Sequence, residues 1–155
     1  MTEEKKMFMQ LLEEECVINT NDIVEYPPVA ISMGETTIQT LKGSKTLPIP
    51  LGTYGNFSFV QAPPKTKKTF FISLLASVYL GNKNKFGGEL RGHRNNKCLI
   101  HFDTEQGKFH AQRVFRRVVD MNQETDLGCY HTFGLRTVGF KHRVDFIEYY
   151  LKEKI

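Results

Sequence analysis

The residues with the clearest chemical potential form a lysine- and threonine-rich loop in front of an apolar segment. Residues 62–69 are Ala-Pro-Pro-Lys-Thr-Lys-Lys-Thr. A phosphate-binding loop of the form G-x-x-x-x-G-K-[ST] has the same Lys-Thr ending, in which the ammonium contacts the β- and γ-phosphates and the hydroxyl binds Mg²⁺. Aligned on this ending, Lys68 takes the phosphate contact and Thr69 the Mg²⁺ contact. The predicted nucleotide-binding residues are Ala62, Pro63, Pro64, Lys65, Thr66, Lys67, Lys68, Thr69 and Phe70.

The loop departs from the general motif at both glycines. Ala62 stands at the first position and Lys67 at the sixth, where glycine would tolerate unusual backbone angles. A proline- and lysine-rich turn before a helix is the alternative interpretation of the same residues. The strand and the helix expected on either side favour the phosphate-binding interpretation, with ATP and Mg²⁺ as cofactors.

Two acidic residues follow the next apolar run. The run Leu99-Ile-His-Phe ends in Asp103, and Glu105 lies two positions further on. Ligands of open α/β sheets bind at the carboxyl ends of parallel strands, which is where both carboxylates would lie. Asp103 also satisfies the loose pattern of a Mg²⁺-binding Walker B strand, so it is a candidate metal ligand beside Thr69. Alternatively, both acids simply begin the next helix, whose dipole favours negative charge.

The hydrophobic pattern predicts the elements that would position these residues. Residues 57–60 are expected to form a short buried strand, and residues 70–80 an almost wholly apolar, buried helix. Two further strands, at 98–103 and 130–135, each precede a segment with helical spacing of apolar residues. This βαβαβα order predicts a parallel sheet flanked by helices. Residues 81–96 are expected to form an exposed connection.

The N-terminal part has a different character. The spacing predicts a short surface helix over residues 3–16, packed on the main body, and residues 19–55 are expected to form an irregular β-hairpin layer. We therefore expect an N-terminal extension over residues 1–55 and a nucleotide-binding core over residues 56–155. The last predicted helix reaches Ile155 without a stop signal, so the core is expected to be incomplete at its C-terminal end.

The composition limits the class of protein. The chain has 155 residues, of which 40% are hydrophobic, as expected for one packed core. Its three cysteines are odd in number and far apart, which favours a reducing, cytoplasmic setting over a disulfide framework. The cysteines and histidines lack zinc-ligand spacing, and no apolar run approaches the ~18–20 residues of a membrane span. The net charge of +4 is compatible with an anionic ligand or partner.

The motifs together resemble a known family. Three features carry the resemblance: the stretch Leu51-Gly-Thr-Tyr-Gly-Asn-Phe-Ser-Phe-Val, the loop ending Lys-Lys-Thr-Phe, and Phe102-Asp-Thr-Glu-Gln-Gly with His110, Gln112 and Arg113. They are similar to a branch of the RecA-like P-loop ATPases, found on bacterial chromosomes, plasmids and phages and related to hexameric plasmid-replication helicases. Loops ending Lys-Lys-Thr occur in that branch, so Lys67 fits it better than it fits the general motif.

The resemblance implies an AAA/RecA-type ATPase fold and specific roles. Glu105 matches the acidic residue that polarises the attacking water, which makes Glu105 and Lys68 the predicted catalytic residues. Arg136, just after the third strand, would face the nucleotide or a subunit boundary. The family's Walker B strand would follow the last helix, which argues against Asp103 in that role. The implied setting is DNA replication, mobilisation or repair by a homo-oligomer.

Other interpretations remain open at this point. The chain could bind nucleotide without hydrolysing it, or it could be a small P-loop kinase with residues 81–96 as a lid. It could also be a DNA-binding or assembly module without nucleotide, because lysines and arginines cluster around the loop and the following connection. Arg113, Arg116 and Arg117 favour a solvated helical face, with a DNA or subunit contact as the alternative.

Overall fold

The structure is a computed structural model that describes residues 2–21, 25–40, 43–81, 87–123 and 127–154. Within these residues the strands form two separate sheets. The elements are α1 (Glu3–Cys16), β1 (Val29–Thr40), β2 (Gly43–Thr53), α2 (Lys68–Gly81), β3 (Leu90–Gly92), β4 (Leu99–Asp103), α3 (Lys108–Asn122), β5 (Tyr130–Gly134) and α4 (Phe140–Glu153). None of the described helices is long and apolar enough to cross a membrane.

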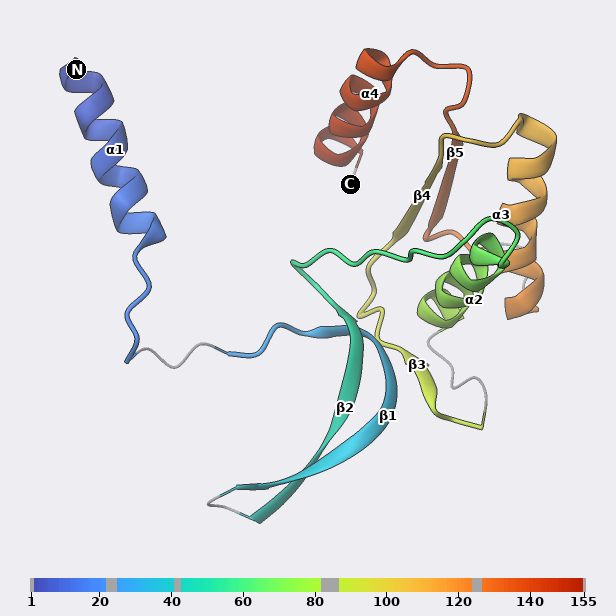
Figure 1. The fold of residues 1–155 in the computed structure, drawn as a ribbon, viewed down its shortest axis with the longest axis horizontal. Coiled ribbons are helices and arrows are strands. Elements are labelled where there is room, and N and C mark those ends of the chain that lie inside the picture. The colour runs from blue at the N-terminus through green and yellow to red at the C-terminus, as the bar shows by residue number, and fades with distance from the viewer. Residues whose placement is uncertain (1, 22–24, 41–42, 82–86, 124–126, 155) are drawn as a thin grey trace.

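Helix α1 stands apart from the rest of the molecule (Figure 1). None of its residues, all of them described, is buried, and the apolar side chains of Met7, Phe8 and Leu11 are exposed. The predicted helix is confirmed, whereas its predicted packing on the main body is not observed. The helical spacing of apolar residues therefore predicted the helix correctly but did not predict whether it packs on the rest of the chain.

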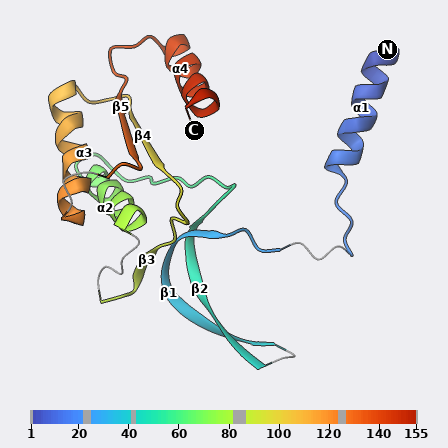
Figure 2. The ribbon, with the colours of Figure 1, turned by 180° about the vertical axis from the view of Figure 1, so that it is seen from behind.

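The first sheet is antiparallel and contains three strands in the order β2-β1-β3. Strands β1 and β2 form a long curved hairpin, visible from both sides in Figures 1 and 2. On its other edge β1 pairs with β3, from Ile31 opposite Gly92 to Met33 opposite Leu90. The hairpin confirms the predicted β layer, but β3 lies in the segment predicted to be only a connection.

The second sheet is the parallel pair β4 and β5, with α3 as its connection. Successive side chains of a strand point to opposite faces, and both faces of this pair are covered. Phe115 of α3 packs against His101 with ring centroids 4.9 Å apart. On the other face, Phe146 of α4 lies 6.4 Å from Phe102 and 5.2 Å from Phe133. The two predicted strands and their parallel direction are therefore confirmed.

The predicted RecA-like parallel sheet is wrong. Residues 57–60 form no strand, and the side chains of Phe57 and Phe59 are 85% and 88% exposed. The structure instead has an antiparallel three-stranded sheet and a separate two-stranded parallel sheet. Local alternation of apolar and polar residues is compatible with a strand, but a strand also needs a neighbour to bond its backbone groups. In this fold no strand pairs with residues 57–60 within the described part of the chain.

Helix α2 joins the two sheets. It packs against α3 on one side and against β1 and β3 on the other. Its Ala76, Tyr79 and Leu80 form the core cluster with Val118 of α3, and both Val78 and Val118 are fully buried. The predicted buried helix is confirmed, because an apolar run without a polar face finds partners on most of its sides.

A tyrosine cluster closes the core near the end of β2. The Tyr54 hydroxyl lies 2.7 Å from the carbonyl oxygen of His93, to which it donates, and 3.1 Å from the hydroxyl of Tyr79. Burial is the main cause that raises the pKa of Tyr79, so this phenol stays protonated. The cluster thereby ties the hairpin and α2 to the connection between β3 and β4.

We expect Gly92→Ala to destabilise the protein by about 1–3 kcal/mol. A Cβ at this position would lie 2.2 Å from the carbonyl oxygen of Val78 and 2.7 Å from the Cα of Tyr79. Both obstacles are backbone atoms of α2, so β3 would have to move away from the helix. The free energy of unfolding in denaturant measures the effect. Gly52→Ala is the matched control, because a Cβ there meets no atom within 4 Å; equal losses in both variants would contradict the close-approach argument.

Candidate functional site

The loop before α2 contains two residues with a left-handed backbone conformation. Lys65 and Lys67 have positive φ angles of 65° and 63°. Lys67 takes the position at which the general motif has glycine, and it adopts a left-handed conformation that costs a non-glycine residue about 1–2 kcal/mol. Backbone N–H groups beside such residues converge into concave anion-binding nests.

Hydrogen bonds fix the loop to the start of α2. The Thr66 hydroxyl donates to the carbonyl oxygen of Pro63 at 2.6 Å, which closes the loop. The carbonyl oxygen of Lys67 accepts from the N–H groups of Phe70 and Phe71 at 2.9 and 3.1 Å. The N–H groups of Lys68 and Thr69, which precede these two in the helix, point away from the helical carbonyl groups and lie at the positive end of the helix dipole.

A cavity of about 500 Å³ opens at this helix start. It is lined by Lys67, Thr69, Phe70, Gln106, Val114 and Arg117. Thus the end of the loop, the turn after β4 and the middle of α3 meet at one place. Lys68 and Glu105 are both exposed and lie outside this lining set.

Arg117, like Gln106 and Val114, lines this cavity although the sequence did not predict it as a site residue. Its guanidinium carbon lies 5.4 Å from the centre of the Phe70 ring, and its Nη1 donates to the Ser73 hydroxyl at 3.4 Å. Arg117 therefore points toward α2 and not into solvent. The signal was present, because Arg117 follows the buried Val114 by three positions and so shares its helical face.

Asp103 shapes the turn between β4 and α3. Its carboxylate is buried, and Oδ1 accepts the backbone N–H groups of Glu105 at 3.0 Å and Gln106 at 2.8 Å. The carbonyl oxygen of Asp103 accepts the N–H of Leu135 at 2.7 Å. These bonds place Gln106 in the cavity and leave Glu105 exposed beside it.

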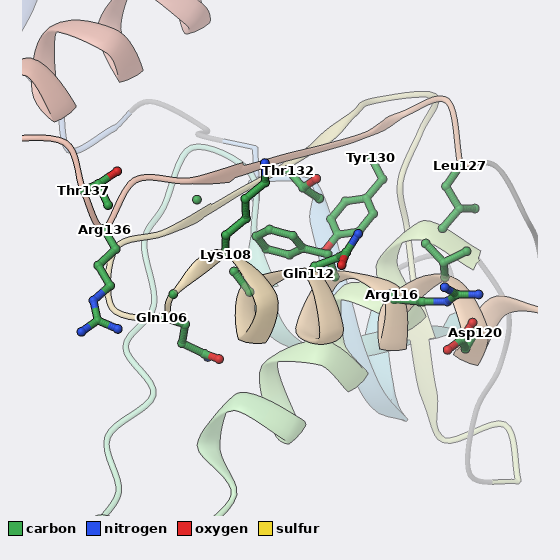
Figure 3. Close-up of a pocket in the computed structure, with 15 residues that line it drawn as sticks. Gln106, Lys108, Gln112, Arg116, Asp120, Leu127, Tyr130, Thr132, Arg136 and Thr137 are labelled. Atoms are coloured by element: carbon green, nitrogen blue, oxygen red, sulfur yellow. The ribbon is translucent and has the colours of Figure 1, made fainter.

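Arg136 lies in a neighbouring cavity. This second cavity has a volume of about 980 Å³ and runs between α3 and β5 (Figure 3). Arg136 is exposed at the end of β5 and lines the second cavity, but it is not among the residues that line the first. Gln106 lines both, so the two cavities adjoin at this residue.

Two half-buried side chains of the β4–β5 pair, His101 and Tyr130, have shifted pKa values. Burial lowers the pKa of His101, with Asp103 opposing the shift, and burial raises the pKa of Tyr130. The two groups lie 3.0 Å apart, from Nδ1 to the hydroxyl oxygen. Within the described ranges, no group of three or more His, Cys, Asp and Glu residues could hold a metal ion.

No protein-family model, curated protein or solved structure matches the chain. The candidate site is therefore defined by its own geometry: a basic loop, a helix start, a buried aspartate turn and an inward-facing arginine. Of these groups, the loop lysine, the helix start and the arginine present hydrogen-bond donors and positive charge to a common space, which is the chemistry of an anion-binding site.

We expect Asp103→Ala to lower the free energy of unfolding by about 1–3 kcal/mol, because two backbone N–H groups would lose their acceptor. Asp103→Asn keeps an oxygen at the acceptor position and should cost less than half as much. Chemical unfolding of the two variants measures the difference. If Asn proves as harmful as Ala, the two hydrogen bonds are not what Asp103 contributes.

Proposed function

We propose that the chain binds Mg-ATP at residues 62–69 and hydrolyses it, as a P-loop ATPase. The cavity at the start of α2 carries this proposal, because Lys67 and Thr69 share it with Arg117 and Gln106. The positive φ of Lys67 supports it further, since this lysine adopts the backbone conformation that the motif requires of a glycine. The resemblance extends the proposal to a role in DNA replication, mobilisation or repair.

Each residue of the site has a distinct role in this proposal. The Lys68 ammonium contacts the β- and γ-phosphates, and the N–H groups at the start of α2 bind phosphate oxygens. The guanidinium of Arg117 offers a planar fork of donors that matches a phosphate group. Arg117 is half-buried and held by Phe70 and Ser73, so its orientation is set before a ligand arrives.

Thr69 is the residue that fits Mg²⁺ best. Its hydroxyl is the kind of oxygen ligand that Mg²⁺ takes in phosphate sites, where the ion keeps several waters and phosphate oxygens. Asp103 fits less well, because its Oδ1 already accepts two backbone N–H groups. A bound Mg²⁺ would neutralise phosphate charge, while Thr69 and the loop orient the ligand.

Glu105 is the proposed general base. It follows the carboxyl end of β4 and is exposed directly beside the cavity residue Gln106, so its carboxylate is free to accept a proton from water. Binding without hydrolysis is the second candidate function, because Glu105 lies outside the residues that line the cavity. The kinase alternative placed its lid at residues 81–96, of which 82–86 lie outside the described residues.

We expect Lys68→Ala to weaken the binding of Mg-ATP by about 10- to 150-fold, because the variant loses one charge-assisted contact to phosphate. Calorimetry or a fluorescent ATP analogue measures the dissociation constant. Lys141→Ala is the matched control, because Lys141 is exposed on α4 and carries the same charge. Equal affinities in the wild type and Lys68→Ala would remove the proposal.

We expect Glu105→Gln to bind Mg-ATP as tightly as the wild type but to release phosphate at least about 10²-fold more slowly. The amide keeps the shape of the carboxylate and cannot accept the proton. Phosphate release at saturating ATP measures the change. A wild type that binds ATP without turnover would favour the second candidate function, and unchanged turnover in the variant would exclude Glu105 as the base.

A further inference from the structure

The cavity between α3 and β5 is a groove with its own chemistry. Lys108, Gln112 and Arg116 recur at four-residue intervals and so form a ridge on one face of α3. Thr132 of β5 and Arg136 line the same groove, as Figure 3 shows. We call this cavity the α3–β5 groove.

The groove carries an excess of positive charge. Among the described residues that line it, Lys108, Arg116 and Arg136 are the cations and are all exposed, whereas Asp120 is the one acid. None of these cations forms an ion pair with an acidic side chain of the described part of the chain. Unpaired cations along one groove raise the local concentration of an anionic ligand.

The spacing of the cations indicates an extended ligand. Lys108 and Arg116 are eight residues apart on one helix, which corresponds to about 12 Å at a rise of 1.5 Å per residue. This axial separation lets each side chain contact a different phosphate of an extended ligand. A chain with repeated negative charges satisfies them, together with Arg136 at the end of β5.

The floor of the groove is aromatic. Phe115 and Tyr130 both line it, with their ring centroids 6.4 Å apart in an edge-to-face arrangement. Ring surfaces combined with a row of cations are typical of proteins that bind single-stranded nucleic acid, because bases stack on rings while phosphates pair with cations. A purely acidic peptide such as poly-glutamate would use the cations but would leave this ring surface without a matching group.

We propose that the α3–β5 groove binds a single strand of nucleic acid. Its volume of about 980 Å³ lies at the top of the range of small-molecule pockets, about 300–1,000 Å³, and admits a few nucleotides but not a duplex. The phosphates pair with Lys108, Arg116 and Arg136, and bases contact Phe115 and Tyr130. This site is separate from the ATP site and does not rest on it, although Gln106 borders both cavities.

Fluorescence anisotropy of a labelled oligo(dT) of about 20 nucleotides tests the groove in the full chain, with no ATP added. We expect Arg116→Glu to weaken binding at least about tenfold, because one phosphate contact is replaced by repulsion. Arg113→Glu is the matched control: it makes the same change of charge on α3, but Arg113 lies outside the groove and stacks on Phe109. The control should change affinity less than about twofold. Equal losses in both variants would overturn the proposal in favour of a diffuse basic surface.

The salt dependence gives a second readout. Three phosphate contacts predict a slope of about −2 for the logarithm of the binding constant against that of the salt concentration, and Arg116→Gln should reduce it by about 0.7. A slope unchanged by Arg116→Gln would overturn the proposal, as would a poly-glutamate peptide that binds the groove while oligo(dT) does not. The Lys68→Ala variant should bind oligo(dT) like the wild type. A loss of ATP binding can therefore be told apart from a loss of oligo(dT) binding. Thermal unfolding of each variant verifies that it folds.

Discussion

The parallel pairing of β4 with β5 is the constraint on which the rest of the candidate site depends. Parallel neighbours cannot be joined by a tight turn. The chain therefore leaves β4 at its carboxyl end, crosses as α3, and enters β5 at the end of the sheet where β4 began. The carboxyl ends of both strands consequently lie together, and the bond from the Leu135 N–H to the Asp103 carbonyl joins them. Gln106 and Arg136 therefore lie close to each other although thirty positions separate them in the sequence.

The same crossover gives α3 two functional faces. Val114, Arg117 and Val118 face α2, so that Arg117 reaches the cavity at the start of α2. Lys108 and Arg116 lie on the face toward β5 and line the groove instead. Arg116 and Arg117 are neighbours in sequence, yet they line different cavities because consecutive helical residues do not share a face. One helix thereby separates the proposed nucleotide chemistry from the proposed nucleic-acid contact.

The two sheets are joined by packing and not by strand pairing. Helix α2 lies between α3 and the β1–β3 sheet, and the close approach of Gly92 to the backbone of Val78 fixes how near β3 can come. The Tyr54 hydroxyl adds a polar tie to the connection that leads into β4. The start of α2, which follows the loop of residues 62–67, is therefore held by contacts along the helix and not by a strand before the loop.

The sequence by itself determined the elements whose stability is local or whose apolar pattern is unambiguous. The buried helix after the loop, the hairpin layer and the strands β4 and β5 follow from residue periodicity, and the Lys-Thr ending marks the candidate loop. Only the tertiary structure decided which strands pair. Residues 57–60 have a strand-like pattern but no partner, while the three residues of β3 find one in β1. It also decided that Arg117 faces inward and that Asp103 supports a turn. The physical reason is that periodicity reports what one segment can bury, whereas pairing and side-chain direction depend on which distant segment lies against it.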